Sequence, residues 1–319
     1  NLGTPEGTDY WSMRKYLKQF LMDKRVVDIF RPLWWLILNG PILTFRPSKS
    51  GKAYQKIWDK DNHGSPLRKF TINQTSKLKK IFESYKNISI EYAMRYGTPE
   101  IEKTLNEMTK KGCSKILLVP LYPQYAASTS ATVKDEVFKW MLKQRWQPDL
   151  RTIAPWFDNH NYIKALAETV KKNIINKNKL DKLIVSFHGI PKRYFMAGDP
   201  YHCHCIKSAR LLKEELKWPD DKILVTFQSR FGPEPWLQPY TDETIIELAK
   251  QGQKNIAVVA PGFISDCLET LEEINVEARE LFIENGGESF EYIPCLNDNE
   301  YSIKFLEYII KQNLLGWNS

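Results

Sequence analysis

The sequence repeats one pattern: RYGTPEIEKTLNEMTKKGCSKILLVP at residues 95–120, and RFGPEPWLQPYTDETIIELAKQGQKNIAVVAP at residues 230–261. Both stretches begin with a turn containing glycine and proline, continue with a segment of helical periodicity, pass a glycine and end in a short apolar run. Each therefore predicts a turn, a helix and then a strand. A repeat of this length indicates two similar α/β halves.

A weaker repeat relates Gly3-Thr4-Pro5 to Gly189-Ile190-Pro191, which follows an apolar run at residues 183–187. If the two segments correspond, the residues that form the matching strand precede Asn1. The sequence also starts without a methionine. We therefore expect a natural N-terminus upstream of Asn1 and a strand that is missing from the chain as given.

Four continuous apolar runs alternate with segments of helical periodicity, at residues 116–119, 183–187, 223–225 and 256–259. Runs that are apolar on both faces are typical of parallel strands covered by helices. We predict two doubly wound, Rossmann-like halves, each with a parallel four-stranded sheet.

The expected halves span residues 1–152 and 153–298, and a last helix within residues 299–319 packs back on the first half. Parallel sheets of this kind bind ligands beyond the carboxyl ends of their strands. The unusual polar and aromatic loops all follow predicted strands, so an active site is expected there, in a cleft between the halves.

The composition favours an intracellular globular protein. Lys and Arg number 46 against 38 Asp and Glu, a net charge of +8 that gives a modest preference for anionic partners. The basic residues form no nucleic-acid-binding motif. Five cysteines without a paired framework indicate a reducing compartment. The longest purely apolar run, residues 33–38, is too short to span a bilayer, which needs about 20 residues.

His188 ends a predicted strand and precedes Gly189. An imidazole there could accept a proton or bind a transition metal; alternatively, it caps the strand by bonding to a neighbouring loop. Glu269, Glu273 and Glu277 are spaced to share one helix face, which is either a solvated acidic face or a path for a divalent cation. An imidazole opposite a carboxylate suits an ion such as Fe²⁺ and leaves positions open for exchange.

Two other groups of residues have more than one interpretation. His202-Cys203-His204-Cys205 lacks the spacing of a zinc motif, so structural metal is disfavoured. Cys267 is interpreted as a buried small residue, although it could contact a passing metal.

An apolar segment at residues 33–45 contains Trp34 and Trp35 and has basic neighbours, including Lys24, Lys49 and Lys52. This combination suits docking on an anionic membrane surface, or a lip over a flat apolar ligand. We expect the lip to govern membrane association but not folding, in a cytoplasmic protein attached peripherally to the inner face of a membrane.

Taken together, these motifs resemble the ferrochelatase family over nearly the whole chain. The specific pieces are residues 186–191 with 198–201, residues 228–233 with 235–237, and Ser265-Asp266 with residues 269–271. Their order and spacing make coincidence improbable.

The resemblance implies an enzyme, a lyase that inserts Fe²⁺ into protoporphyrin IX to make protohaem, with iron as substrate and no organic cofactor. It implies His188 and Glu269 as the catalytic pair, with His188 and the carboxylates of Glu269, Glu273 and Glu277 contacting the metal. It further implies a porphyrin pocket lined by four residues: Leu2, Arg95, Tyr122 and Trp236.

The sequence departs from the family pattern in two places. Relatives with an iron–sulfur cluster have a cysteine soon after the motif at residues 122–125 and a Cys-rich tail, whereas this chain has Ala126-Ala127 and no such tail. We therefore expect no iron–sulfur cluster. Cys267 stands where many relatives have histidine.

The lip resembles the bacterial branch that uses protoporphyrin. The alternatives are a chelatase that uses coproporphyrin or another metal, and a two-lobed protein that binds haem or another tetrapyrrole without chemistry. The chemistry agrees with the residues, because metallation needs a base for two pyrrole protons, ligands for the cation and an apolar slot for the macrocycle.

Overall fold

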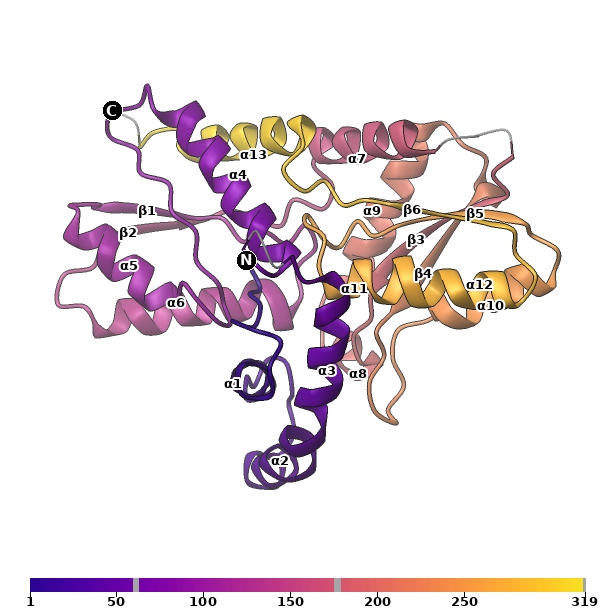
Figure 1. Ribbon diagram of the computed structural model, residues 1–319. Coiled ribbons are helices and arrows are strands. Elements are labelled where there is room, and N and C mark those ends of the chain that lie inside the picture. The colour runs from indigo at the N-terminus through magenta and orange to yellow at the C-terminus, as the bar shows by residue number, and fades with distance from the viewer. Residues whose placement is uncertain (60–62, 175–178, 318–319) are drawn as a thin grey trace. The chain divides into compact units, whose positions relative to one another are not determined.

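The structure is a computed structural model that describes residues 1–59, 63–174 and 179–317 (Figure 1). It divides into two units. Unit 1 comprises Asn1–Leu121, Ala126–Ala154 and Leu306–Ser319, and unit 2 comprises Tyr122–Tyr125 and Pro155–Phe305. Helix α13 (Glu300–Asn313) begins in unit 2 and ends in unit 1.

Unit 2 contains a parallel four-stranded sheet in the order β4-β3-β5-β6. The strands are β3 (Lys182–His188), β4 (Ile223–Gln228), β5 (Asn255–Val259) and β6 (Ser289–Ile293). Strand β3 is paired on both edges, with β4 and with β5, and its residues from Leu183 to Phe187 are buried. This burial explains why the strand is apolar on both faces.

Helices cover both faces of this sheet (Figure 1). One face carries α10 (Thr241–Lys250) and α12 (Arg279–Glu284), whose apolar side chains pack with β5 in one buried cluster around Phe282 and Phe290. The other face carries α7 (His160–Asn173) and α9 (Tyr201–Leu216). Shorter helices are α8 (Lys192–Met196), the 3₁₀ helix η3 (Asp220–Lys222), α11 (Leu268–Leu271) and the π-helix η4 (Glu273–Ala278).

Unit 1 is also α/β, but its sheet differs from the prediction. Within its described residues, only β1 (Lys115–Leu118) and β2 (Asp149–Thr152) form a parallel sheet. Residues 1–3 pair with residues 93–96 through a few backbone hydrogen bonds, such as Arg95 N–H to the Asn1 oxygen at 2.8 Å. The α/β class with parallel sheets is confirmed, whereas four strands in the first half is wrong for the residues that the structure describes, where the sheet of unit 1 consists of β1 and β2.

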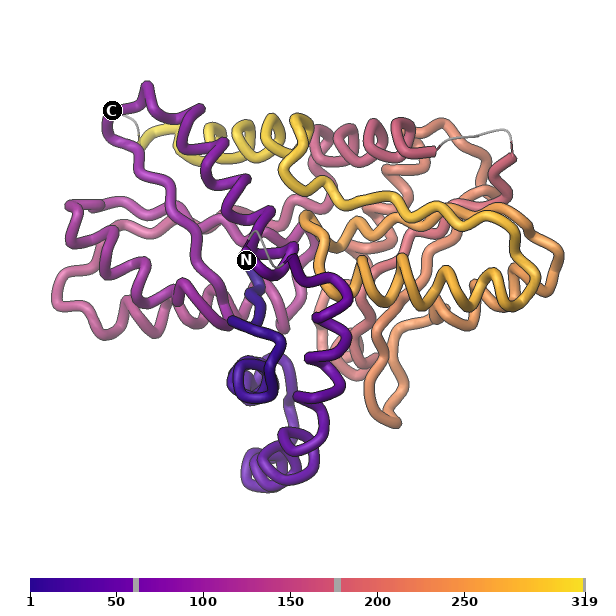
Figure 2. The backbone as a smooth tube through the Cα atoms, in the orientation of Figure 1, coloured from indigo at the N-terminus to yellow at the C-terminus, as the bar shows by residue number. Residues whose placement is uncertain are grey.

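The helices of unit 1 are α1 (Tyr10–Leu21), α2 (Arg31–Ile37), α3 (Leu43–Ile57), α4 (Pro66–Phe82), α5 (Ile101–Lys110) and α6 (Thr132–Lys143), with π-helices η1 (Leu38–Ile42) and η2 (Ala127–Ala131). Helices α1, α2 and α3 form an extension of unit 1 away from β1 and β2 (Figure 2). None of the described helices is long and apolar enough to cross a membrane.

The lip residues divide into two sets. Trp34 and Leu38 are buried, and the indole N–H of Trp34 donates to the Leu21 oxygen at 2.7 Å. Trp35, Leu36 and Phe45 are exposed, with 52%, 62% and 73% of their surfaces accessible. The expectation that the whole segment is dispensable for folding is therefore wrong for Trp34 and Leu38. These two residues are four positions apart, so they lie on the same face of the helix, and this face packs into the core of unit 1.

The structure also corrects the alignment of the internal repeat at its beginning. Met94 N–H donates to the Pro99 oxygen at 2.7 Å, and Phe227 N–H donates to the Pro239 oxygen at 2.8 Å, each just before a helix begins. Met94 therefore corresponds to Phe227, and Arg95 corresponds to Gln228 rather than to Arg230. The loop of unit 2 is longer, and the similar Arg-aromatic-Gly triplets reflect turns with a left-handed glycine in both units.

Candidate active site

The predicted histidine lies at the carboxyl end of the central strand of unit 2. His188 is the last residue of β3 and is paired in register with Gln228, the last residue of β4. Its Nδ1–H donates to the Gly189 oxygen at 2.6 Å, which assigns the ring proton to Nδ1. Nε2 then carries the lone pair that can accept a proton or bind a metal.

Gly189 allows the Gln228 backbone and the Trp236 ring to lie close to the chain beside this histidine. A Cβ atom at this position would lie 3.0 Å from the Gln228 oxygen and 3.1 Å from the Trp236 ring, which is closer than side chains normally pack, so a larger residue would crowd both. The Trp236 indole donates to the Phe231 oxygen at 2.9 Å, and its ring centroid lies 6.5 Å from that of His188. The predicted Trp236 is thus beside His188.

Gln228 connects the ends of β3 and β4 to the acidic helix, which is the segment from α11 through η4 that carries Glu269, Glu273 and Glu277. Its amide oxygen accepts from the Ser186 hydroxyl at 2.7 Å, and its amide N–H₂ donates to the backbone oxygen of Glu269 at 2.7 Å and to the carboxylate of Glu273 at 3.4 Å. Ser229, in a left-handed conformation, also donates to Glu273. The side chain of Gln228 is buried, so these bonds hold the start of the acidic helix against β3 and β4.

The acidic helix is not a regular α-helix. After α11 the chain forms the π-helix η4, in which Glu277 N–H donates to the Glu272 oxygen five residues earlier at 2.9 Å. Helix α12 continues from its end. Such π-helical turns occur frequently at functional sites.

The protonation of Glu273 is set by its surroundings. Burial raises the pKa of this carboxyl, the nearby charges of Glu269 and Glu277 raise it further, and hydrogen bonds from Ser229 and Gln228 lower it, leaving a pKa of about 8. Glu273 therefore holds its proton through most of the neutral range. A buried carboxyl of this kind can give up and regain a proton near physiological pH.

Asp266 anchors the loop that precedes Glu269. The buried carboxylate accepts hydrogen bonds from the Tyr292 and Thr270 hydroxyls, from Cys295 N–H at 3.2 Å and from the Asn297 amide at 2.7 Å. The donors lie on α11, on β6 and on the segment that follows β6. They fix where α11 begins and thus where Glu269 lies.

Two of the remaining predicted residues belong to unit 1. Arg95 donates to Asp23 and to the Thr132 hydroxyl, and the Tyr96 hydroxyl also donates to Asp23. Burial raises the Asp23 pKa, but the bond from Thr132 and the charge of Arg95 outweigh it, so the pKa lies below its usual value. The Arg95 guanidinium is thus held in a largely buried ion pair. Leu2 is half-buried and its oxygen accepts from Tyr96 N–H at 2.9 Å.

Tyr122 and the His-Cys-His-Cys segment belong to unit 2. Tyr122 is buried. His204 stacks on Phe157 with ring centroids 3.7 Å apart, and its Nδ1 accepts from Tyr125 N–H at 3.2 Å. Cys205 is buried on α9, whereas Cys203 is exposed. His204 therefore has a packing role.

Burial raises the pKa of the Cys267 thiol well above its usual value, and the neighbouring Glu269 raises it further. This thiol stays protonated. Among the described residues, no three His, Cys, Asp or Glu side chains form a group that could hold a metal ion. The acidic helix thus offers successive single carboxylates rather than a closed metal site.

The structure shows contacts for three residues to which the sequence analysis assigned no role. Gln228 and Ser229 hold Glu273, and Asp266 anchors the loop. All three lie within the motifs that follow predicted strands. Their position after predicted strands indicated a functional site, but the sequence did not indicate that Gln228 and Ser229 contact Glu273, or which residues contact Asp266.

The fold and these polar strand ends define a chelatase-type α/β protein. SirB from Bacillus subtilis with Fe³⁺ aligns at a TM-score of 0.54 with 17% identity, over 79% of this chain and 92% of that structure. The structure of CbiX, described as the terminal enzyme of sirohaem biosynthesis in denitrifying bacteria, aligns at 0.50 with 12% identity, over 78% and 94%. At these identities the likeness concerns the fold alone.

Sequence comparison identifies the family. The profile of the ferrochelatase family matches residues 1–314. Proteins named ferrochelatase from Allorhizobium ampelinum and Rhizobium meliloti are 55% and 53% identical over 99% of this chain, which spans 92% and 94% of their lengths; one from Brucella ovis is 49% identical over 99% of the chain and 90% of its own length. The chain belongs to the ferrochelatase family, the metal-inserting lyases of haem biosynthesis.

We predict that Glu273 makes stability fall as the pH rises. Its folded-state pKa of about 8 lies above the ordinary value of 4.5, so the folded protein retains a proton that the unfolded chain has lost. The free energy of unfolding is lowered progressively between about pH 4.5 and 8, by roughly 5 kcal/mol if the full shift is realised. Glu273→Gln should flatten this slope in urea unfolding measured across that range.

The exposed Glu284→Gln variant on α12 is the matched control and should keep the wild-type slope. Equal slopes in Glu273→Gln and wild type would show that Glu273 titrates normally.

Proposed function

We propose that this chain inserts Fe²⁺ into protoporphyrin IX to make protohaem, the last step of haem biosynthesis. The observation that carries the proposal is the arrangement at the end of β3. His188 presents Nε2 there, and Gln228, its partner in register, bonds to the helix of Glu269 and Glu273. The base, His188, and the carboxyl groups of the acidic helix are thereby held at the carboxyl end of the same sheet.

The reaction needs these two functions. Two pyrrole N–H protons must leave the macrocycle, and the cation must exchange water for protein ligands before it enters the ring. In the proposal His188 and Glu269 share proton removal and metal delivery, with Glu273 and Glu277 behind them. Carboxylates that bind the ion singly release it readily, which suits a substrate ion.

Trp236 supports a porphyrin beside His188. Its ring lies within 6.5 Å of the imidazole and offers an apolar face for the macrocycle. Leu2, Arg95 and Tyr122 complete the proposed porphyrin contacts. Arg95 would have to exchange its ion pair with Asp23 for a porphyrin carboxylate, or act by holding Asp23 in place.

We predict that His188→Ala and Glu269→Gln each lower the rate of anaerobic Fe²⁺ insertion at least a hundredfold, because each removes a group for proton or metal transfer. The rate is measured by the loss of protoporphyrin fluorescence. Porphyrin should still bind, since apolar contacts hold it. Glu277→Gln should have a milder effect.

The exposed His160→Ala variant is the matched control and should keep full activity. Activity of His188→Ala within about threefold of wild type would contradict the assignment. Faster turnover of coproporphyrin, or of Co²⁺, would identify the alternative chelatase, and tight binding without turnover would indicate a tetrapyrrole carrier.

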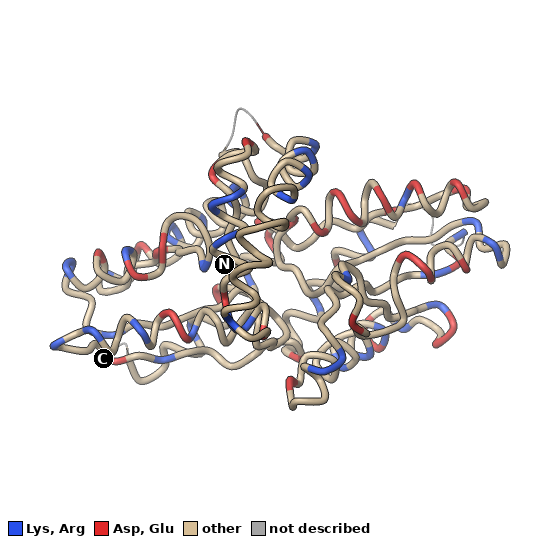
Figure 3. The backbone as a smooth tube through the Cα atoms, turned by 90° about the horizontal axis from the view of Figure 1, so that it is seen from below, with Lys and Arg blue, Asp and Glu red and all other residues tan. Residues whose placement is uncertain are grey.

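Membrane attachment is the second part of the proposal. The exposed lip residues Leu33, Trp35, Leu36 and Phe45 lie on α2 and α3, and Lys24, Lys49 and Lys52 nearby are also exposed. Elsewhere Lys and Arg alternate with Asp and Glu on both units (Figure 3). An apolar group with basic neighbours suits the inner, anionic face of a cytoplasmic membrane.

We predict that replacing Trp35, Leu36 and Phe45 by Ser lowers binding to phosphatidylglycerol vesicles at least tenfold, because burial of each side chain is worth roughly 1.5–3 kcal/mol. Co-sedimentation measures the binding, and the melting temperature should change little.

Two controls separate membrane binding from folding. Leu142→Ser with Trp146→Ser removes apolar surface elsewhere on unit 1 and should leave vesicle binding intact. Trp34→Ser should lower the melting temperature by several degrees, because Trp34 is buried. Unchanged vesicle binding in the triple variant would contradict the proposal.

We further propose that the enzyme works without an iron–sulfur cluster or any cofactor beyond its substrate iron. Cluster ligation usually takes four thiolates, and Cys205, Cys267 and Cys295 are buried with pKa values raised by burial. Anaerobically purified protein freed of porphyrin should show no absorbance between about 320 and 600 nm, and Cys203→Ser with Cys205→Ser should stay active. Acid-labile sulfide that disappears in that double variant would overturn this.

A further inference from the structure

Asp23 is a largely buried carboxylate of unit 1 that the proposed reaction does not use. It lies in the connection between α1 and α2, and 7% of its side chain is accessible. A charged group at this depth is stable only when charged or polar partners surround it. The partners of Asp23 therefore show what holds this connection in place.

Three side chains donate to one oxygen of this carboxylate. Arg95 and the Thr132 hydroxyl donate to Oδ2, and the Tyr96 hydroxyl donates to the same atom at 2.9 Å. Arg95 also donates to the Thr132 hydroxyl at 2.6 Å, which closes a ring of three groups. Thr132 is the first residue of α6 and is fully buried, so the carboxylate is bound to the packed interior of unit 1.

The same residue organises the backbone that follows it. The other carboxylate oxygen of Asp23, Oδ1, accepts from Arg25 N–H at 2.8 Å, and its backbone oxygen accepts from the N–H groups of Val26 and Val27 at 3.1 and 3.0 Å. An aspartate that accepts from the backbone two residues further on fixes a turn. Asp23 therefore sets the path of the chain from the end of α1 toward α2.

Helix α2, on which the lip begins, is attached to this turn. Its Arg31 donates to the Val27 oxygen at 3.2 Å and to the Met22 oxygen, and the indole of Trp34 donates to the Leu21 oxygen at 2.7 Å. The first two acceptors lie on either side of the buried carboxylate in the chain. A displacement of the turn would therefore move the groups to which α2 is bonded.

A second ion pair on the same turn provides a contrast. Arg25 pairs with Asp135 at 2.6 Å, but 41% and 34% of their side chains are accessible, so water competes for both partners. The pair of Arg95 with Asp23 is far less accessible, and loss of one member would leave the charge of the other buried. Glu136, 3.4 Å from the same guanidinium, is more exposed. The turn therefore depends more on Asp23 than on Asp135.

We infer that Asp23 is a positioning residue that holds α2, and with it the lip, in a fixed place on unit 1, and that Arg95 acts through Asp23. The exposed apolar side chains of the lip are then presented together rather than on a loose segment. The consequence for membrane binding rests on the attachment proposed above, whereas the anchoring of α2 does not.

Asp23→Asn and Arg95→Gln test the anchor. Each should speed amide hydrogen exchange of residues 24–37 at least tenfold, because each opens the buried pair that orders the turn. Peptides from α4, in the same unit, should keep their wild-type exchange. The double variant should be no faster than the faster single variant, since both substitutions break one interaction. Mass spectrometry of peptic peptides measures both segments.

Tyr96→Phe keeps the test decisive if either of these variants fails to fold. It removes one donor to Asp23 and keeps the buried ring. Exchange of residues 24–37 should then rise about threefold, as expected for the loss of one hydrogen bond.

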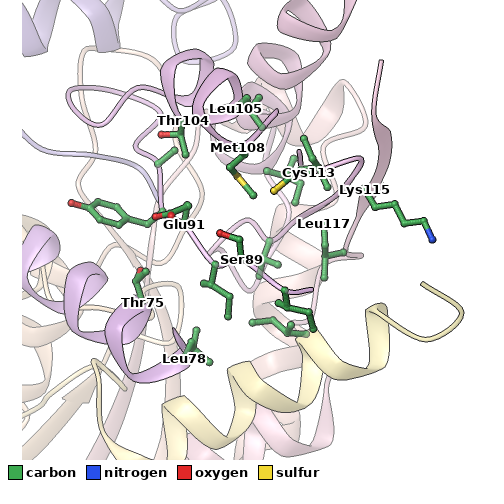
Figure 4. A pocket seen from close by; sticks show the side chains of 18 of the residues that line it. Thr75, Leu78, Ser89, Glu91, Thr104, Leu105, Met108, Cys113, Lys115 and Leu117 are labelled. Atoms are coloured by element: carbon green, nitrogen blue, oxygen red, sulfur yellow. The ribbon is translucent and has the colours of Figure 1, made fainter. Parts of the chain in front are cut away.

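Two control variants separate the anchor from other effects. Asp135→Asn removes the exposed ion pair of the same turn and should change the exchange of residues 24–37 less than about twofold. Leu105 is buried beside a cavity of about 750 Å³ (Figure 4), and none of the residues that hydrogen-bond to Asp23 lines this cavity. Leu105→Ala should therefore lower the melting temperature without speeding the exchange of residues 24–37 relative to that of α4.

Binding to phosphatidylglycerol vesicles supplies a second readout. Asp23→Asn leaves every apolar side chain of the lip intact, yet its binding should weaken at least threefold, because a loose lip must be ordered on the membrane. Asp135→Asn should bind as the wild type does. If the wild-type protein does not bind these vesicles, the proposed attachment fails, and hydrogen exchange alone decides whether Asp23 anchors α2.

Exchange of residues 24–37 within about twofold of wild type in Asp23→Asn, or in Tyr96→Phe if the former does not fold, would overturn the inference. Equal acceleration by Asp135→Asn would do the same. Acceleration by Asp23→Asn but not by Arg95→Gln would show that Arg95 does not act through Asp23. Unchanged vesicle binding in a variant with accelerated exchange would contradict the link between the anchor and the membrane.

Discussion

The central position of β3 is the constraint on which unit 2 depends. A strand buried on both faces must satisfy its backbone through neighbours on both edges, and β4 and β5 provide them in fixed register. This register places His188 beside Gln228 at the carboxyl end of the sheet. Because Gln228 bonds to Glu269, the position of the acidic helix follows from the pairing of two apolar strands.

Desolvation then determines the chemistry of the acidic helix. Three carboxylates along one helix repel each other, and in water they would all be ionised. Burial of Glu273 between its two acidic neighbours raises its pKa to about 8, so one member of the set keeps its proton near neutral pH. Hydrogen bonds from Ser229 and Gln228 limit this shift and hold the group in place. The buried carboxyl of Glu273 therefore keeps a proton that an exposed carboxyl would lose at this pH.

The lip illustrates how one apolar run serves two purposes. Consecutive residues of a helix point in different directions, so Trp34 enters the core while Trp35 faces outward. The sequence of Leu33 to Leu38 contains no polar residue to mark the boundary between these faces. Only packing against the Leu21 backbone, which accepts the Trp34 indole N–H, distinguishes the two tryptophans.

The sequence by itself determined the α/β class, the internal duplication and the motifs at strand ends, because apolar runs, glycine turns and helical periodicity are local properties of the chain. Tertiary structure decided which residues those motifs bring together. The link from Gln228 to Glu273, the ion pair of Arg95 with Asp23 and the π-turn at Glu273 join residues distant in sequence or depend on burial.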